Sequence, residues 1–431
     1  MTLRNLFADT RPLKSLDFRR LWFAQIITVI GAQLTVVAVP AQLYADTGSS
    51  AYVGLTGIFG IVPLIVFGLW GGALADHFDR RNLLIITTLG IIATSAAFFA
   101  IAASGSTNVW FILLVYAAQQ AFFAVNSPTR NAILPHIVDK ELLPAANALN
   151  MTVLSIGGIA GPLIGGAMIP LLGIKWLYLA DVLFLIPTLF AVIALPRHTG
   201  RVSSGEARDG EKRSVGLRSI LEGLRYLHGR TVLIMSFVVD VIATFFGMPR
   251  ALFPQIAHES FGGEIDGGFA FGLLFAAIPA GAALGGAFSG WISRVHRPGK
   301  VVTLAIALWG AGIFVFGVTS GIAGGEPNVW MWIGLVALMV AGGADMASAA
   351  LRNSILLSEV EDSMRGRLQG VFFVVVVGGP RLADTLHGGF GALIGTAATT
   401  AIGGGLVILG MFAVTLLVPT FWRFNSDPHK L

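Results

Sequence analysis

Long apolar runs dominate this chain of 431 residues. A run of about 18 or more apolar residues can cross the hydrocarbon core of a bilayer as a helix. A membrane β-barrel instead needs alternating strands of about ten residues, and the runs here are longer and apolar on all faces. The predicted fold class is an all-α integral membrane protein with twelve transmembrane helices, at about 18–45, 51–75, 82–104, 108–130, 142–171, 174–195, 230–254, 268–292, 300–321, 328–351, 367–395 and 398–420.

The composition argues against an enzyme and against several kinds of site. Charged residues make up 12% of the chain, about half the fraction of a soluble domain. There is no cysteine, so no disulfide framework or thiolate metal site can form, and the eight histidines lack metal-ligand spacing. No phosphate-binding GxxxxGK[ST] sequence occurs. We expect no catalytic residues, no cofactor, no metal and no direct use of ATP.

Basic residues gather on one side of the predicted membrane. Of the 28 Lys and Arg, 25 lie in the two termini and the even-numbered loops, while the odd-numbered loops contribute only Lys175. That count places Arg130 in the fourth loop and Arg352 in the tenth. The asymmetry is typical of cytoplasmic loops and offers no reason to expect a nucleic-acid partner. It predicts a multi-pass protein of the plasma (inner) membrane with both termini in the cytoplasm.

The chain repeats part of itself. The segment 130-RNAILPHIVDKELL-143 corresponds to 352-RNSILLSEVEDSMR-365 at an offset of 222, and 71-GGA-73 recurs as 285-GGA-287. Both pairs fall at equivalent span ends, six helices apart. This indicates two pseudo-symmetric six-helix bundles, an organisation that places a transport path between the halves.

The predicted domains follow from the repeat. They are an N-terminal bundle at 1–195, a cytoplasmic linker at 196–230 and a C-terminal bundle at 231–431. The first part of the linker is rich in glycine, serine and charge. Its second part predicts an amphipathic helix on the cytoplasmic face, with a solvated linker as the alternative. The apolar stripe of that helix would consist of Leu217, Ile220, Leu221, Leu224 and Leu227.

The stretch 71-GGALADHFDRRNLLI-85 places charges between two apolar runs. It resembles the loop motif of the major facilitator superfamily, with His77 and Asp79 departing from the family pattern. The resemblance implies a gating latch, in which a carboxylate at a helix end pairs with arginine or with a neighbouring helix N-terminus. The second copy, 285-GGAFSGWISRVHRPGK-300, has no acid, so the first copy carries the expected role. The alternative is a charge cluster that only sets topology. The latch residues would be Gly72, Asp76, Arg80 and Arg81.

Another stretch, 157-GGIAGPLIGGAM-168, places small residues and a proline inside a span. Small residues let helices pack closely in lipid, and proline kinks a helix. The stretch resembles the fifth-helix motif of exporters in the same superfamily. The predicted helix-packing residues are Gly157, Gly161, Pro162, Gly165 and Gly166.

Most of the chain also resembles one particular branch of the superfamily. The stretches 36-VVAVPAQLYADTGSSAYVGL-55, 275-FAAIPAGAALGGAFSGWISRVHRPGK-300 and 365-RGRLQGVFF-373 are similar to the enterobactin exporter branch. That branch moves catecholate siderophores out of the cytoplasm, and weaker similarity extends to macrolide and multidrug efflux relatives. The resemblance implies a monomer with a central cavity lined by the first, fourth, seventh and tenth helices.

Ionisable residues inside the spans are the best site candidates, because charge in a membrane is costly and usually functional. Asp240 and Asp345 come first, since they fall on the seventh and tenth spans; Asp384 is the third. Burial favours the protonated carboxyl, which suits proton antiport. The alternative is a structural ion pair or a hydrogen-bonded core acid. Asp181 is expected near the outer membrane edge, as a peripheral residue.

Two arginines also fall within spans. Arg381 and Asp384 are three residues apart and can share one helix face. They either neutralise each other or form a switchable pair in which Arg381 attracts an anionic substrate. Arg250 either draws an anion outward or extends to the membrane interface.

Amides and aromatic rings complete the predicted substrate site, since amides can bind hydroxyl groups and rings can stack on catechols. With Arg250 and Arg381, the predicted substrate-binding residues are Gln25, Gln33, Gln119, Gln120, Asn126, Phe245 and Phe246.

The sequence therefore predicts a secondary transporter that works by alternating access and exports a siderophore in exchange for protons. The alternatives are a broad drug or macrolide efflux pump and, from a different class, a membrane sensor or scaffold that does not transport. The expected partners are a small-molecule substrate, protons and the lipid bilayer.

Overall fold

The computed structural model describes residues 9–195, 222 and 225–425; the side chains of 69–77 and of part of 362–377 lie outside the description. Most of the linker 196–230 is therefore not described. The predicted amphipathic stripe falls on it, except for Leu227, which is buried.

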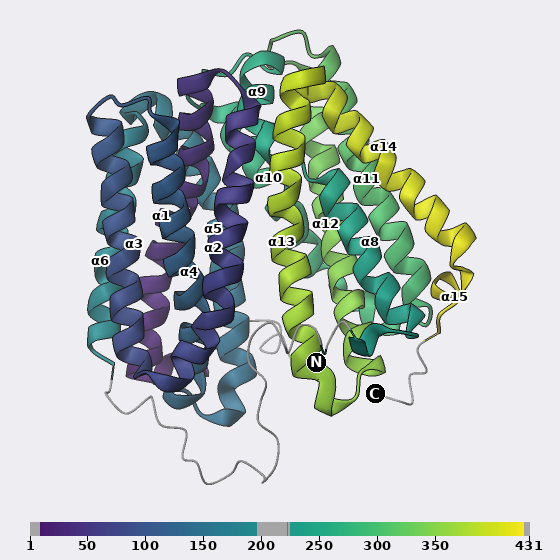
Figure 1. Ribbon diagram of the computed structural model, residues 1–431, viewed down its shortest axis with the longest axis horizontal. Coiled ribbons are helices and arrows are strands. Elements are labelled where there is room, and N and C mark those ends of the chain that lie inside the picture. The colour runs from purple at the N-terminus through teal and green to yellow at the C-terminus, as the bar shows by residue number, and fades with distance from the viewer. Residues whose placement is uncertain (1–8, 196–221, 223–224, 426–431) are drawn as a thin grey trace. The chain divides into compact units, whose positions relative to one another are not determined.

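All the regular structure in the described residues is helical (Figure 1). Among the described residues, eleven helices are long and apolar enough to cross a membrane, and α13, with 33 residues, is the twelfth long helix. A helix satisfies its own backbone hydrogen bonds, which lipid cannot do. The long helices are α1 (Leu16–Thr47), α2 (Ser50–His77), α3 (Arg80–Ala103), α4 (Val109–Ile137), α5 (Leu143–Leu172), α6 (Ile174–Ile193), α8 (Thr231–Gly247, continued by short turns to Ser260), α10 (Phe269–Ala287), α11 (Pro298–Ile322), α12 (Val329–Glu359), α13 (Asp362–Ile394) and α14 (Thr396–Leu417). Short elements join or flank them: η2 (Arg11–Lys14), η3 (Lys140–Leu142), η4 (Arg250–Leu252), α9 (Phe253–Gln255), η5 (Ile256–Ser260), η6 (Ser289–Arg294) and α15 (Pro419–Trp422).

The chain divides into two compact units. Unit 1 comprises Met1–Val39 and Val62–Gly216, and unit 2 comprises Pro40–Ile61 and Leu217–Leu431. The tip of the α1–α2 hairpin thus groups with unit 2, where Ser50 Oγ donates to Gly388 O and Thr385 Oγ1 donates to Gly54 O. The domain limits 1–195 and 231–431 remain a prediction.

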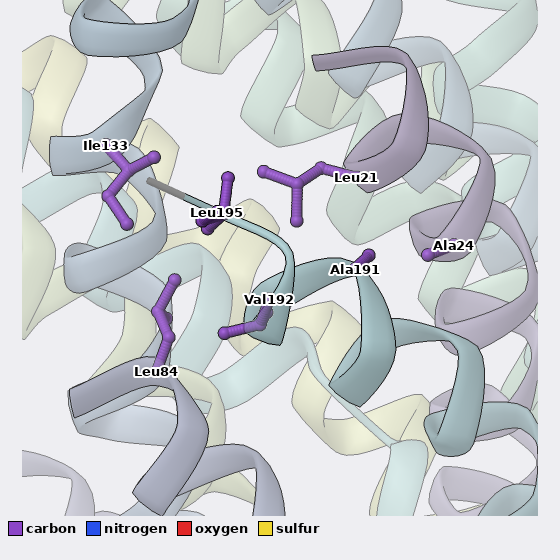
Figure 2. Close-up of a cluster of buried hydrophobic side chains, with 7 residues drawn as sticks. All are labelled: Leu21, Ala24, Leu84, Ile133, Ala191, Val192 and Leu195. Carbon is purple, nitrogen blue, oxygen red and sulfur yellow. The ribbon is translucent and has the colours of Figure 1, made fainter. Parts of the chain in front are cut away.

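In unit 1, α3 packs against α4 and α6, and α5 packs against α6. Figure 2 shows one buried cluster, in which apolar side chains from α1, α3, α4 and the end of α6 converge. Because lipid tails are as apolar as leucine, van der Waals packing between the helices stabilises such a cluster. The cluster consists of Leu21, Ala24, Leu84, Ile133, Ala191, Val192 and Leu195.

In unit 2, α11 packs against α12 and α14, and α8 packs against α13 and α14. Helices α10 and α12 approach closely because each presents a glycine to the backbone of the other. A Cβ at Gly281 would overlap Met339 O, and a Cβ at Gly342 would overlap Ile278 O. Small residues allow this close packing in a membrane protein.

Corresponding turns in the two units have the same backbone geometry. Gly173, between α5 and α6, has φ 85° and ψ 155°, and Gly395, between α13 and α14, has φ 88° and ψ 151°. The offset between them is again 222, and only glycine readily adopts this conformation. The helices α4 and α12 also begin alike, because Asn108 and Asn328 each accept a hydrogen bond from the backbone N–H two residues later. The predicted pair of pseudo-symmetric bundles matches this geometry.

Several helix ends differ from the predicted ones. Helix α4 continues to Ile137 and α12 to Glu359, so Arg130 and Arg352 lie inside helices and not in the fourth and tenth loops. The prediction was wrong there because a hydropathy profile ends a span at its first arginine. A paired arginine can stay inside the helix. Helix α8 ends at Gly247, which places Arg250 on η4.

Candidate transport site

Unit 2 contains a buried ion pair between α8 and α12. Asp240 Oδ1 lies 2.7 Å from Arg352 Nη1, and both side chains are only 4% exposed. Arg352 Nε also donates a hydrogen bond to Ser348 Oγ at 3.2 Å, one turn earlier on α12. Removing the arginine would leave the Asp240 carboxylate uncompensated in an apolar interior. Sequence reasoning found the acid but missed its partner.

Asp345 joins this pair to form an acid–arginine cluster of Asp240, Asp345 and Arg352. It precedes Arg352 by seven residues on α12, which places both side chains on the same helix face. It is partly exposed, and it lies close enough to Arg352 and Asp240 for their charges to act on it. One arginine cannot neutralise two carboxylates, so the cluster balances its charge when it holds one proton.

A second ion pair in unit 2 joins α13 to η4. Asp384 Oδ2 lies 3.1 Å from Arg250 Nη2, with the carboxylate 3% and the arginine 32% exposed. The sequence treated these two residues separately and paired Asp384 with Arg381, which lies one turn earlier on α13. His387 follows one turn after Asp384 and is also buried. It was missed, although a histidine inside a span is itself a signal of function.

The sequence predicts that Asp181 on α6 is peripheral, and the structure shows that it is not. It is 1% exposed, and its Oδ2 accepts hydrogen bonds from Thr35 Oγ1 and Ser95 Oγ, each at 2.8 Å. The position along the span indicated an outer edge. The prediction was wrong because hydroxyl groups on α1 and α3 enclose the carboxyl group.

The predicted amides on α4 divide between two kinds of environment. Gln119 Nε2 donates to Ser95 Oγ at 3.2 Å, and Asn126 Nδ2 donates to Thr87 Oγ1 at 2.8 Å, so both amides bridge buried groups of α3 and α4. Gln120 is only partly buried. The substrate roles of all three remain predictions.

The other predicted substrate residues lie on α1 and α8. Gln25 and Gln33 are partly buried on α1. Phe245 and Phe246 on α8 are also partly buried, and their ring centroids lie 5.2 Å apart in a T-shaped arrangement.

The glycine-rich stretch of α5 lies directly against α1 in unit 1. A Cβ at Gly157 would overlap Val29, and one at Gly161 would overlap Gln33. Gly165 lies over Leu34 and Val37. Pro162 and Gly166 are buried on the same helix. This is a close helix–helix contact made by small residues.

The expected latch is described only in part. Gly72 and Asp76 lie on α2, and their side chains fall outside the description. Arg80 is buried and donates to Ala132 O at 3.1 Å, near the end of α4. Arg81 donates to Ile193 O from two nitrogens, at 3.1 and 2.6 Å, at the end of α6. Arg81 thus binds a carbonyl group at a helix C-terminus, where a positive charge is favourable, and Arg80 binds one in the last two turns of α4.

The comparisons with known proteins agree with this architecture. The family model described as Major Facilitator Superfamily matches residues 21–383. The chain is 28% identical over 419 residues to the enterobactin exporter EntS of Shigella boydii serotype 18, covering 96% of this chain and 94% of the relative. It is also 28% identical over 418 residues to EntS of Citrobacter koseri, covering 95% and 94%.

Two solved structures show the same fold. A nucleoside transporter, NupG, has a TM-score of 0.70 at 12% identity and covers 95% of this chain and 100% of its own. A bacterial homologue of the iron transporter ferroportin has a TM-score of 0.67 at 13% identity and covers 98% and 100%. This chain belongs to the major facilitator superfamily, and it is a multi-pass secondary transporter of small molecules and not an enzyme.

Proposed function

We propose that this transporter exports a catecholate siderophore in exchange for protons, by alternating access. The observation that carries the substrate class is the similarity to enterobactin exporters along 95–96% of the chain. The glycine row of α5, which resembles an exporter motif, supports the outward direction. The charge asymmetry of the loops supports an inner-membrane location with cytoplasmic termini.

The acid–arginine cluster is the proposed proton-coupling site. With both carboxylates ionised, Asp240 holds Arg352 and the charge of Asp345 is in excess. Asp345 is the more exposed of the two acids, so it accepts the exchanged proton first. A proton on Asp240 would release Arg352 from its only carboxylate contact within the described residues. Such a change in pairing can bias a two-state conformational equilibrium.

Catechol chemistry explains how proton and substrate can exclude each other. A catechol presents two adjacent O–H donors, and an ionised carboxylate presents two acceptor oxygens. Protonation of Asp345 removes the negative charge that makes these hydrogen bonds strong. The site therefore binds either a proton or the catechol, as antiport requires.

The remaining predicted residues have separate proposed roles. Asp384 is the proposed second coupling acid, since its charge is held by Arg250 across two elements of unit 2. Arg381 and the partly buried rings of Phe245 and Phe246 are proposed to contact the substrate, together with Gln25, Gln33 and Gln120. Gly72, Asp76, Arg80 and Arg81 are proposed to gate the cycle.

The test uses purified protein in liposomes with an imposed proton gradient. Wild type should move a catecholate siderophore up its gradient, whereas Asp345→Asn, which resembles the protonated acid, should bind the siderophore more weakly and lose transport driven by the proton gradient. Glu359→Gln is the matched control, because Glu359 lies exposed at the end of the same helix. If transport by Asp345→Asn still followed the proton gradient, the cluster would not be the proton-coupling site.

A cationic dye provides the comparison substrate. Movement of the dye without the siderophore would replace the proposal with a broad efflux pump. Movement of neither, under a gradient shown to be intact, would favour the sensor or scaffold alternative.

A further inference from the structure

Unit 1 carries a deeply buried carboxyl group that the proposed coupling scheme does not use. Four helices meet at it: Asp181 is on α6, Thr35 on α1, Ser95 on α3 and Gln119 on α4. Gln119 Nε2 donates to Ser95 Oγ, Ser95 Oγ donates to Asp181 Oδ2, and Thr35 Oγ1 donates to the same oxygen. The donors of this network therefore all point towards Oδ2, which is its final acceptor.

The second carboxylate oxygen of Asp181, Oδ1, lies against carbon atoms of neighbouring residues. Oδ1 is buried and makes no hydrogen bond within the described residues. It lies beside Gly31 of α1, where an added Cβ would be 2.7 Å from Oδ1 and 3.1 Å from Phe184 Cβ. One turn before Asp181, the ring of Tyr178 stacks on Phe98 with centroids 5.1 Å apart.

The charged groups on the four helices lie away from this carboxyl group. Lys175 lies six residues earlier on α6, over the Trp176 ring. Arg80 and Arg81 bind carbonyl groups at the ends of α4 and α6. The other titratable side chains on these helices are Asp17, Arg19, Arg20, Tyr44 and Asp46 on α1, Tyr116, Arg130 and His136 on α4, and Tyr178 on α6. Within the described part of the chain, Asp181 bonds only to the two hydroxyl groups.

This environment decides the protonation state. An ionised carboxylate buried without a cation is much costlier than a neutral carboxyl group that keeps its hydrogen bonds. Both accepted hydrogen bonds go to Oδ2, so Oδ1 is the oxygen free to carry the proton. A metal cation does not fit, because it needs several oxygen ligands and Oδ1 is enclosed by Gly31 and Phe184.

We propose that Asp181 is a second proton-binding site, located in unit 1, which stays neutral while α1 packs at Gly31 against α6 and ionises when this contact opens. Opening would admit water to Oδ1 and hydrate the charge. The protonated state stands independently of the substrate; only the release step rests on the proposed proton antiport. The ligand is the proton itself.

The test begins with purified protein without substrate or gradient, at pH 7.5. Infrared difference spectra between wild type and Asp181→Asn should show the carbonyl stretch of a protonated carboxyl group in wild type alone. Identical spectra in that region would mean that Asp181 is ionised and would overturn the proposal.

Gly31→Ala provides a second variant if Asp181→Asn folds poorly. Its methyl group forces α1 away from Oδ1, so the carboxyl band should fall at least twofold at the same pH. Gly68→Ala is the matched control, since a Cβ there meets no atom within 4 Å. An unchanged band in Gly31→Ala would contradict the role of this contact.

The release step is measured with a pH indicator as siderophore is added. Asp181→Asn should release fewer protons than wild type, and an unchanged release would overturn proton exchange at Asp181. The infrared arm needs no substrate, so failure of the siderophore assignment leaves it intact. Asp345→Asn should retain the Asp181 band, which separates the two sites.

Discussion

Two copies of the same arginine motif end in different electrostatic states. Arg352 in unit 2 is 4% exposed and paired with Asp240. Arg130, its counterpart on α4, is partly buried and makes no hydrogen bond or ion pair in the part of the chain that the structure describes. Helix α1 has no acid between Asp17 and Asp46 to neutralise it. In unit 2 the buried acid and arginine therefore form an ion pair, whereas in unit 1 the buried acid, Asp181, is not paired with Arg130.

The largest expected effect follows from breaking the joined pair. Arg352→Met leaves Asp240 buried without a counter-charge and should lower the free energy of unfolding by about 3–5 kcal/mol. Arg130→Met removes no partner among the described residues and should cost about 1 kcal/mol. Unfolding in detergent micelles measures both. Equal losses for the two variants would show that the repeat is electrostatically symmetric after all.

A double variant sharpens the same contrast. Asp240→Asn combined with Arg352→Met removes both charges, so it should recover about 2 kcal/mol of the loss caused by Arg352→Met alone. Gradient-driven transport should stay absent, because the Asp240–Arg352 pair that responds to the proton is gone. If the losses of unfolding free energy from the two single substitutions simply add in the double variant, the two charges do not stabilise each other.

The sequence could predict the helices but only part of the site. Lipid requires long apolar helices, so the spans were visible, and Asp240 and Asp345 stood out as acids within them. The pairing of Asp240 with Arg352 joins residues 112 positions apart, and no local pattern reports such a contact. The sequence predicts Arg352 in a loop, because a single arginine ends an apolar run in a hydropathy profile. Asp181 was misplaced for a similar reason: Thr35 and Ser95, which enclose it, lie on other helices.

The turns offer a feature that should be symmetric where the arginines are not. Gly173→Ala and Gly395→Ala each force a side chain into a backbone region that is essentially limited to glycine, which costs about 1–3 kcal/mol. The two losses of unfolding free energy should agree within error. Gly389→Ala is the control, because its surroundings are open and alanine favours a helix. A loss of stability in only one of the two variants would mean that the units differ in backbone strain as well as in charge pairing.

The helix caps extend this comparison to a smaller energy. Asn108 and Asn328 each accept a 3.0 Å hydrogen bond from a tryptophan backbone N–H at the start of α4 and α12. Replacing either by alanine should cost about 1 kcal/mol. Unfolding measurements on the two single variants test this directly, and Asn→Asp at the same positions should retain most of the stability. A cap that matters in one unit only would contradict the shared geometry.

The smallest effect concerns an exposed ion pair in the same unit as the buried one. Arg230 and Glu361 approach to 3.5 Å, but their side chains are 40% and 69% exposed. Water and salt screen such a pair, so Glu361→Gln should change the free energy of unfolding by less than about 0.5 kcal/mol. The change should shrink further at high salt, whereas the cost of Arg352→Met should hardly respond, because its partner is screened from solvent. A loss from Glu361→Gln that approached the loss from Arg352→Met would mean that burial is not what gives the α8–α12 pair its strength.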